Sequence, residues 1–542
     1  MYETHHQTGM RRNNGMRSRV WLLAVVAFAV GSASAACTGG TVMPLGDNAP
    51  ARVDGEGRYV LPADFSTLRT NRAAWDFPMR LHLGDADGIS FDWRCSDVAL
   101  CTGFNVYLRS GKGWYTARFD PEDTNGWQRI TVTKDAMLKT EGAVAGWEAV
   151  DALRLGMWRG AKGKVEFGFA NLSVIPRGSQ KPAVDALNSK LLLDDAACKA
   201  ARIPRSGEWR AFWIHAPLVK GKARDWDGDM RTLKARGFNA ILPNLAYAGT
   251  AFYRSSVLPV HPSVEKEGDA LDACLAACRK YGMECHVWNI CWKTGRYADK
   301  AFLERMKAEG RMQRGFGGES KELWLCPTHP ANRTMEVESF VELAKKGVDG
   351  VHFDYIRYPG PDYCFCDRCR ALFEAQIGRR VERWPADVRA DSDLAARWNA
   401  FRCAAVSALV KAVSARIRRD YPGVKLSAAV FSNPDFDPAR IGQPWVEWCK
   451  EGVLDFACPM NYNDSCIAFR GLVRAQREAV GEVSTKLRPG IGLSCWQKRY
   501  RPRDAVILAR QIGIVRDAGL DGFCVFDLDA RSMEATKDFG ND

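Results

Sequence analysis

Two regions of the chain differ in how their hydrophobic and polar residues are spaced. Residues 52–176 lack helical periodicity and contain short apolar runs broken by Gly, Asp and Asn, such as Phe104–Leu108 and Trp127–Val132. Several short strands at this spacing predict an all-β sandwich of a jelly-roll-like type. From Glu208 onward, apolar runs of strand length alternate with amphipathic segments of helical period, which predicts an α/β region.

The α/β region contains eight candidate strands, each an apolar run that ends in polar residues. They are Arg210–His215, Ala240–Asn244, Glu284–Asn289, Gly350–Asp354, Lys425–Phe431, Leu454–Asn461, Leu487–Leu493 and Gly522–Asp527. Helices are expected between most of them, such as Trp226–Arg236, Asp269–Tyr281, Met335–Lys346 and Ser392–Tyr421. This pattern predicts a (β/α)₈ TIM barrel at residues 208–542, with an insertion at about 360–424 after the fourth strand. A doubly wound sheet is the alternative, but no Gly-rich phosphate-binding turn follows the first strand.

The first residues predict export. Four Arg residues precede the apolar run Val20–Val30 and the small residues 31–36, which is the pattern of a secretory signal peptide over residues 1–36. The apolar run is shorter than the roughly 20 residues that a membrane span needs. Cys37 directly follows small residues, as at a lipoprotein cleavage site, so a lipid anchor on Cys37 is an alternative, although Ser34 stands where such sites usually carry Leu. We therefore expect a periplasmic, outer-membrane or secreted protein.

The segments that flank the predicted sandwich look like connections. We expect residues 37–51 to form a flexible N-terminal segment and residues 177–207 to form a linker with a short helix near Asp185–Ala201. Within the sandwich, Trp114, Trp127 and Trp158 offer ring faces on which sugars could stack, although core packing is the common role of a single Trp. The sandwich is accordingly a candidate carbohydrate-binding module.

Charge and cysteine content narrow the function classes. The 77 Lys and Arg exceed the 64 Asp and Glu, so the net charge is +13 and acidic polymers are plausible partners. No basic stripe or known nucleic-acid module is present, so we expect no nucleic-acid partner. Many of the 18 cysteines lie in apolar runs, where Cys acts as a small buried hydrophobe. Cys95 and Cys101 flank a short turn and are the best candidates for a disulfide.

In a TIM barrel the active site lies at the C-terminal ends of the strands, so the residues there are the candidate site. Carboxylates come from three strands, at Asp354, Asp464 and Asp527. The other candidates are His215, Asn244, Trp288, Asn289, His352, Arg357, Tyr358, Asn461, Tyr462 and Trp496. Such a mixture of polar and aromatic side chains suits a polyhydroxylated substrate, whereas the absence of Lys weakens a Schiff-base mechanism.

The densest motif is VDGVHFDYIRYP at Val348–Pro359. Its strand delivers Asp354 to the barrel mouth, and Arg357 lies three residues further on. An Arg at this distance would keep the carboxylate ionised, as a nucleophile or an oxocarbenium-stabilising anion must be. His352 should point to the same side as Asp354. The alternative is a buried Asp–Arg pair that only holds the loop.

The run Asp349–Pro359 resembles the signature of the bacterial glycosyl-hydrolase-like family 10. Further matching segments are Glu208–Trp213, Phe252–Ser255, His286–Asn289 and Leu454–Tyr462. The resemblance covers roughly residues 208–530. It implies a (β/α)₈ barrel that hydrolyses glycosidic bonds, and some relatives act on cell-wall glycan. The fourth-strand motif is also similar to that of alpha-amylase-type barrels, in which the matching Asp is the nucleophile, and this points to Asp354.

One departure concerns the second catalytic group. Alpha-amylase-type enzymes place a catalytic Glu at the end of the fifth strand, where this chain has Ser432–Asp435. Glycoside hydrolysis usually needs two carboxyl groups, so the general acid would be Asp527 or Asp464, favoured equally, or Asp435. The sequence thus predicts an exported glycoside hydrolase that acts on a polysaccharide or on peptidoglycan. A non-catalytic glycan-binding envelope protein on the same scaffold is the alternative.

A cysteine cluster follows the fourth strand. Cys364, Cys366 and Cys369 have C-x-C-x-x-C spacing and could hold a structural Zn²⁺ with a fourth ligand from elsewhere in the chain. The competing interpretation is one disulfide plus a free thiol, as expected in an oxidising compartment. No H-E-x-x-H pair accompanies the cluster, so we expect no catalytic cofactor.

Overall fold

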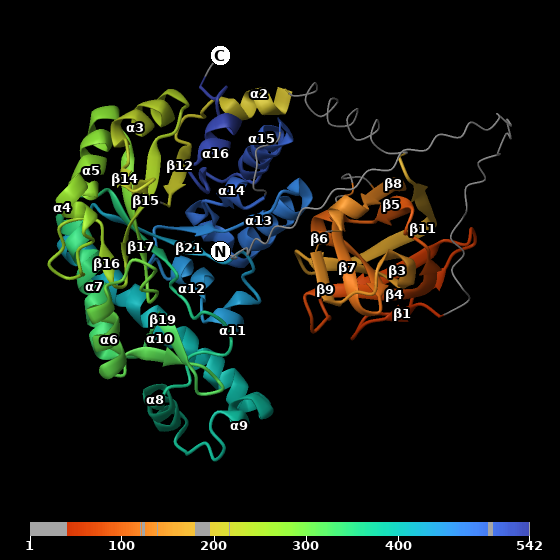
Figure 1. Cartoon of the computed structure of the whole chain (residues 1–542), viewed down its shortest axis with the longest axis horizontal. Coiled ribbons are helices and arrows are strands. Elements are labelled where there is room, and N and C mark those ends of the chain that lie inside the picture. Colours follow the sequence, from red (N-terminus) through yellow and green to blue (C-terminus); the bar gives the residue numbers. More distant parts are fainter. Residues whose placement is uncertain are drawn as a thin grey trace, which may run out of the picture.

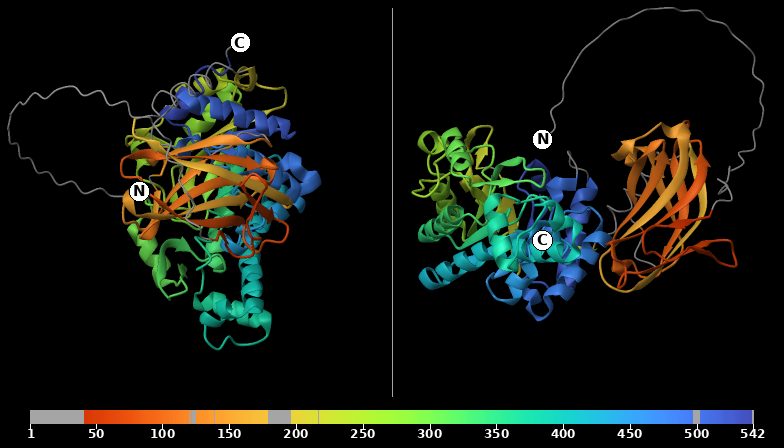
Figure 2. Two further views of the ribbon diagram at one scale, coloured as in Figure 1. Left: turned by 90° about the vertical axis from the view of Figure 1, so that its right-hand side faces the viewer. Right: turned by 90° about the horizontal axis from the view of Figure 1, so that it is seen from below.

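The computed structural model describes residues 41–119, 121, 125–137, 139–178, 196–215, 217–496 and 502–540. These residues form a β-sandwich and a parallel barrel that lie side by side (Figures 1 and 2). The predicted signal peptide, Cys37 and residues 179–195 of the predicted linker lie outside the described residues. Within the described part of the chain, none of the helices has the length and hydropathy that a membrane crossing requires.

The sandwich consists of two antiparallel sheets, with strand orders β1-β4-β10-β6-β7-β9 and β2-β3-β11-β5-β8. The strands are β1 (Met43–Pro44), β2 (Arg52–Val53), β3 (Tyr59–Asp64), β4 (Arg72–Leu81), β5 (Ala86–Cys95), β6 (Cys101–Ser110), β7 (Lys112–Phe119), β8 (Gln128–Thr133), β9 (Lys139–Ala143), β10 (Val150–Arg159) and β11 (Lys164–Pro176). Alternate residues of β5, namely Ile89, Phe91 and Trp93, are fully buried between the sheets.

The sandwich begins earlier than the sequence predicted. β1 lies within residues 37–51, where we expected a flexible segment, and it pairs with β4. The indole nitrogen of Trp75 on β4 donates to the Ala49 carbonyl oxygen at 2.9 Å. Met43–Pro44 and Ala49 therefore belong to the edge of the first sheet.

The barrel has the order β22-β21-β20-β17-β15-β12-β24-β23, and two parallel bridges between the β22 and β23 regions close the ring. Its strands are β12 (Trp209–Ile214), β15 (Ala240–Tyr247), β17 (Glu284–Ile290), β20 (Gly350–Asp354), β21 (Lys425–Val430), β22 (Phe456–Pro459), β23 (Gly490–Ile491) and β24 (Gly522–Val525). Each corresponds to one of the eight predicted runs, so the predicted barrel is confirmed. All six residues of β12 are buried, as expected for a strand covered on both faces.

The helices of the described chain lie around the outside of the barrel, except that α8 and α9 project away from it (Figure 1). They are α2 (Ala196–Arg202), α3 (Trp226–Ala235), α4 (Ser263–Glu267), α5 (Ala270–Tyr281), α6 (Lys300–Ala308), α7 (Pro330–Lys345), α8 (Asp367–Ile377), α9 (Ala386–Ala390), α10 (Ser392–Asp420), α11 (Asp437–Ile441), α12 (Trp445–Lys450), α13 (Cys466–Val480), α14 (Leu493–Trp496), α15 (Pro502–Asp517) and α16 (Ala530–Ala535). The insertion after β20 contains α8 and α9 and leads into the 29-residue α10. A hairpin of β18 (Met312–Arg314) and β19 (Ser320–Leu325), which the sequence did not predict, lies between β17 and β20.

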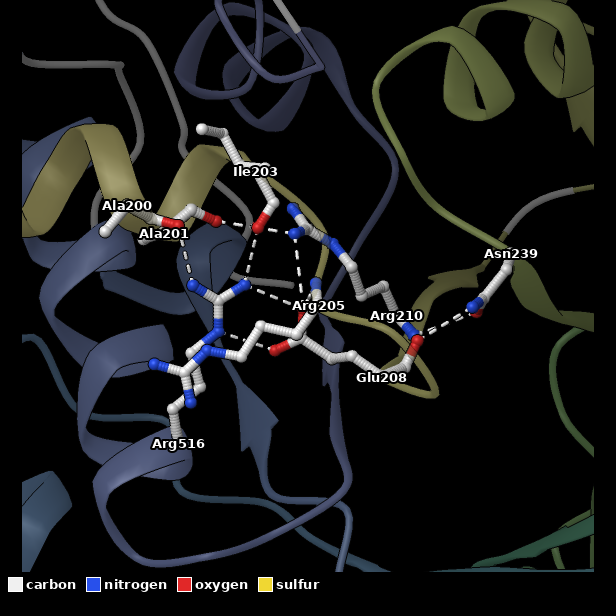
Figure 3. A network of polar contacts seen from close by, with 8 residues as sticks. All are labelled: Ala200, Ala201, Ile203, Arg205, Glu208, Arg210, Asn239 and Arg516. Atoms are coloured by element: carbon white, nitrogen blue, oxygen red, sulfur yellow. Dashed lines mark hydrogen bonds and ion pairs between the residues drawn. The ribbon is translucent and has the colours of Figure 1, made fainter. Parts of the chain in front are cut away.

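A buried ion-pair network closes the end of the barrel opposite the strand C-termini (Figure 3). Arg516 of α15 donates to both carboxylate oxygens of Glu208 at 2.7 and 2.8 Å, just before β12 begins. The same guanidinium donates to the carbonyl oxygens of Ala200 and Ile203 in and after α2. These contacts attach the linker helix to the barrel, so the network is structural.

The sandwich contacts the barrel through α13. Ile467 of α13 packs against the sandwich core, and α13 contacts β6. Gly471 allows this approach, because a Cβ atom there would lie 2.3 Å from the carbonyl oxygen of Cys101. Since α13 follows β22, this contact places one edge of the sandwich beside the barrel mouth.

Candidate active site

A cavity of about 680 Å³ opens at the C-terminal ends of the barrel strands. It is lined by Trp213, His215, Tyr247, Trp288, Ile290, Lys293, Gly295, Arg296, Tyr297, Leu323, Asp354, Tyr355, Arg357, Ala429, Phe431, Met460, Tyr462, Cys495 and Phe526. Among these lining residues Asp354 is the only carboxylate. The cavity lies where the fold predicts an active site.

Asp354 is the last residue of β20 and is 7% exposed. The Tyr355 backbone N–H donates to its Oδ1 at 2.6 Å. Burial raises the pKa of Asp354 to about 6, although the Tyr355 N–H and the charge of Arg357 act in the opposite direction. The expectation that Arg357 keeps this carboxylate ionised is therefore only partly met, because the loss of hydration outweighs the nearby positive charge.

Arg357 makes no direct ion pair with Asp354. Its guanidinium lies over the rings of Tyr355 and Phe431, 4.7 and 4.8 Å from their centroids, and donates to the Tyr358 carbonyl oxygen at 3.0 Å. The predicted buried Asp–Arg pair is thus replaced by a guanidinium held between aromatic rings in the cavity wall.

Two further cations line the cavity beyond the end of β17. Lys293 lies 4.8 Å from the centroid of the Tyr355 ring, and Arg296 donates to the Tyr297 hydroxyl at 2.6 Å. With Arg357, the lining carries three cations against one carboxylate. Lys293 and Arg296 could not be predicted from the strand ends, because they belong to the loop after β17, which returns over the cavity.

Aromatic rings form the floor beside Asp354. The Tyr462 and Phe526 rings are stacked at 5.2 Å, and the Trp213 ring meets Tyr462 edge-on at 6.3 Å. Trp288 contacts His215 at 5.4 Å. Such ring faces suit the apolar faces of sugars and exclude water from the carboxyl group.

His215 is exposed to the cavity and surrounded by protein on its other sides. Desolvation lowers the pKa of His215, while the charge of Asp527 opposes this effect. The imidazole is therefore neutral near pH 7 and offers one hydrogen-bond donor and one acceptor.

Five predicted substrate-binding residues are fully buried and do not line the cavity. They are Asn244, Asn289, His352, Tyr358 and Asn461. His352 accepts from the Trp213 indole at 3.1 Å and its Nδ1 lies 2.8 Å from the Ser427 hydroxyl. Burial holds the pKa of His352 well below its usual range, so the ring is neutral and orients Trp213 from below.

The buried amides have comparable roles. Asn244 donates to the carbonyl oxygens of Ala246 and Trp288, both at 3.2 Å. Asn461 exchanges hydrogen bonds with Gln476 at 2.6 and 3.1 Å. These side chains hold the strand ends beneath the cavity and do not reach a substrate in this arrangement.

The remaining predicted carboxylates lie around the mouth but do not line the cavity. Asp527 is half-buried after β24, which is four strands from β20 in either direction around the ring, so it faces Asp354 across the barrel. The Asp527 backbone N–H donates to the Ser494 hydroxyl oxygen at 3.0 Å. Asp464 is half-buried after β22, and Asp435 is exposed. Trp496 ends α14, and its side chain lies outside the described residues.

A second cavity of about 470 Å³ adjoins the first, because Phe431, Met460 and Tyr462 line both. Asn71, from the loop before β4 of the sandwich, forms part of its wall. Asp437, which the sequence analysis did not select, lines it too and is paired with Arg440 at 2.8 Å. The sandwich thereby extends the hollow at the barrel mouth.

The three sandwich tryptophans that the sequence singled out are partly buried, and each lies beside an arginine. Trp114 of β7 is 4.2 Å from the Arg154 guanidinium. Trp158 of β10, in the same sheet, is 5.4 Å from that of Arg72. Trp127 belongs to the other side of the domain and packs against Gly168, so its ring is part of the sheet surface.

The predicted disulfide and the predicted zinc site involve different cysteines. Cys95 and Cys101 are buried, and the structure has them as free thiols. Burial and the neighbouring Cys95 thiol raise the pKa of Cys101, so the two side chains lie together and the disulfide stays a prediction.

The predicted zinc site includes a fourth cysteine, Cys326. The sulfurs of Cys326, Cys364, Cys366 and Cys369 all lie within 4.8 Å of one another.

The family model described as glycosyl hydrolase-like 10 matches residues 210–497, more than half of the chain. The chain belongs to this family, as the sequence motif indicated. No curated protein matches it significantly. Among solved structures, it is similar to the PgaB (BpsB) glycoside hydrolase domain from Bordetella bronchiseptica, with 16% identity and a TM-score of 0.50 over 61% of this chain and 98% of that one.

The catalytic domain of β-amylase from Paenibacillus polymyxa is also similar, with 12% identity and a TM-score of 0.44 over 61% of this chain and 98% of that one. Similarity to the PgaB domain at 16% identity bears on the fold alone, which is the TIM barrel. The match to the glycosyl hydrolase-like family supports a glycan-cleaving enzyme.

Proposed function

We propose that this member of the glycosyl hydrolase-like 10 family is an exported enzyme that hydrolyses O-glycosidic bonds in a polysaccharide or cell-wall glycan, with Asp354 as its essential carboxyl group. The observation that carries the proposal is a single buried carboxyl group at the mouth of a TIM barrel, beside an aromatic floor. Export by the predicted signal peptide is part of this proposal, with a lipid anchor on Cys37 as the alternative to a free N-terminus.

The environment of Asp354 favours the role of proton donor over that of nucleophile. A general acid must hold its proton close to the working pH, and a desolvated carboxyl group packed against tryptophan does so. With a pKa of about 6, Asp354 can give its proton to the glycosidic oxygen as the bond to the anomeric carbon breaks. This assignment exchanges the roles that the sequence analysis gave to Asp354 and its partner.

The partner carboxylate is then Asp527, on the opposite side of the mouth. It would take the proton of the water molecule that adds to the anomeric carbon, so that the net reaction is addition of water across the glycosidic bond. Asp527 follows β24 next to the floor residue Phe526, and its charge acts on His215. Asp464 lies only two strands from β20 and is the second candidate.

The cavity walls suit a charged, extended substrate. Trp288, Tyr462 and Phe526 can stack on sugar rings, while Lys293, Arg296 and Arg357 can meet carboxylate or sulfate groups. The adjoining cavity at Asn71 and the sheet that carries Trp114 and Trp158 offer further sugar positions. An acidic glycan chain that passes from barrel to sandwich is the substrate class that this arrangement favours.

The experiment is a screen of the purified mature protein against peptidoglycan and against neutral and acidic polysaccharides, with released reducing ends as the readout. On any responsive glycan, Asp354→Asn should lower kcat by about 100- to 10,000-fold, as expected for loss of general acid catalysis. Asp435→Asn removes an exposed carboxylate and is the matched control. Synthetic glycosides with leaving groups that need no protonation should recover most of the lost rate in Asp354→Asn.

Full activity of Asp354→Asn on natural glycan would refute the assignment. The second candidate function, glycan binding without cleavage, is favoured by one observation: only one carboxylate lines the cavity. It requires saturable binding to a glycan from which the wild-type protein releases no reducing ends.

A further inference from the structure

Four buried cysteine sulfurs meet beside the barrel mouth. Cys326 follows β19, Cys364 and Cys366 lie in the loop before α8, and Cys369 is in the first turn of α8. The Cys326 sulfur lies 3.6 Å from that of Cys369, 3.7 Å from that of Cys366 and 3.9 Å from that of Cys364. All four thiols are free and at most 6% exposed.

These separations match a tetrahedron around one metal ion. A Zn–S bond of about 2.3 Å in tetrahedral geometry places neighbouring sulfurs about 3.8 Å apart. The four sulfurs also lie within 4.8 Å of one another in every pairing, so none is turned away from the common centre. A disulfide would require two of them to approach to about 2.05 Å.

We propose that Cys326, Cys364, Cys366 and Cys369 bind one structural Zn²⁺ ion. The surroundings support thiolate ligands: the Arg314 backbone N–H donates to the Cys364 sulfur at 3.3 Å, and the Thr328 hydroxyl lies 3.2 and 3.3 Å from the sulfurs of Cys326 and Cys369. Four protein ligands leave no open position, so the ion is structural and takes no part in catalysis.

The ion would link the cavity wall to the insertion that follows β20. Cys326 comes one residue after the hairpin strand β19, which carries the cavity residue Leu323. Cys364 lies seven residues after Arg357 in the chain. The four sulfurs therefore connect two loops of the barrel mouth to α8. No single strand or helix of the described chain makes this connection.

A second thiol group provides an internal comparison. The sulfurs of Cys274, Cys278 and Cys285 also lie within 4.8 Å of one another, between α5 and β17. This group has three cysteines and, in the described part of the chain, no fourth His, Cys, Asp or Glu ligand. We expect it to remain free of metal, so the zinc content should be one ion per chain.

The first test measures metal content. The full chain, expressed with its own N-terminal segment in zinc-containing medium and purified without chelator, should carry one zinc per chain by elemental analysis and native mass spectrometry. Cys326→Ser and Cys369→Ser should each reduce that content at least tenfold. Cys403→Ser is the matched control, since its half-buried thiol lies outside the cluster and contacts the Pro438 carbonyl oxygen at 3.3 Å.

The second test uses the wild-type protein alone, so its result does not depend on the folding of a variant. X-ray absorption of the wild-type protein at the zinc edge should give four sulfur neighbours at about 2.3 Å. When the protein is denatured and treated with an alkylating agent, all four cysteines should be labelled, both before and after zinc has been removed. A protein with less than 0.1 zinc per chain, or one in which mass spectrometry finds Cys326 in a disulfide with Cys364, Cys366 or Cys369, would overturn the proposal.

Discussion

The role of Asp354 can be decided by removing the positive charge of Arg357. Burial raises the pKa of Asp354 from 3.8 to about 6, which corresponds to about 3 kcal/mol against the ionised form. Arg357 acts against this rise without touching the carboxyl group. An opposite charge within about 4–6 Å lowers a carboxyl pKa by about 1–3. Without a direct contact we take the lower end, so Arg357→Gln should raise the pKa of Asp354 to about 7.

The sign of the effect separates the two mechanisms. If Asp354 donates a proton, activity falls as pH rises through about 6 in the wild type, and through about 7 in Arg357→Gln. If Asp354 must be ionised, activity instead rises through the same values. The pH profile of kcat/KM reports the free enzyme, so changes in substrate affinity alone do not move its inflection.

A direct titration removes the dependence on substrate. Carboxyl ¹³C chemical shifts of the wild-type protein, compared with Asp354→Asn, give the pKa of this group alone. Arg440→Gln is the control, because it removes a nearby cation whose partner is Asp437. An unchanged pKa in Arg357→Gln, or a wild-type activity that rises through pH 6, would refute the reasoning given for a proton donor.

Three further predictions concern other parts of the molecule. Burial raises the pKa of Glu336 from 4.5 to about 8. Between these pH values the folded chain binds one more proton than the unfolded chain, so the free energy of unfolding falls as the pH rises from about 5 to 8. Glu336→Gln keeps the acceptor for the Trp292 N–H and should flatten the dependence of the urea midpoint on pH over this range. Arg296→Gln should raise KM for acidic glycans about tenfold and leave KM for neutral glycans unchanged; equal effects on both would contradict charge recognition. Trp114→Ala should weaken retention on insoluble polymer by about 5- to 30-fold, taking roughly 1–2 kcal/mol for the truncation of an aromatic contact residue, without changing kcat on short oligosaccharides. Unchanged retention would exclude this sheet from substrate binding.

The motif around Asp354 and the order of the apolar runs could be predicted from the sequence, because each depends only on residues that are close together in the chain. Strand β20 has the predicted bounds, and the other seven barrel strands lie at the predicted runs. A parallel strand that is buried on both faces is apolar along its length, so its position shows without knowledge of its neighbours. The helix α5 is similar: Asp269 caps its start by accepting from the Leu271 and Asp272 N–H groups.

Other site residues could not be predicted from strand ends. Whether a residue at the end of a strand faces the cavity or the layer beneath depends on its register and on the packing around it. His352 and Asn461 lie beneath the floor for this reason. Arg296 lies over the cavity because the loop after β17 turns back, and Asn71 reaches the mouth because the sandwich docks on α13.

The sequence by itself determined the barrel, the sandwich, the family and the position of Asp354, since each depends on spacing along the chain. Only the tertiary structure decided how strongly Asp354 is desolvated, because Trp213, Trp288 and Phe526, which line the same cavity, are distant from it in sequence. It also identified Cys326 as the fourth thiol of the cluster, which lies 38 residues before Cys364 and meets it only when the hairpin and the insertion pack together.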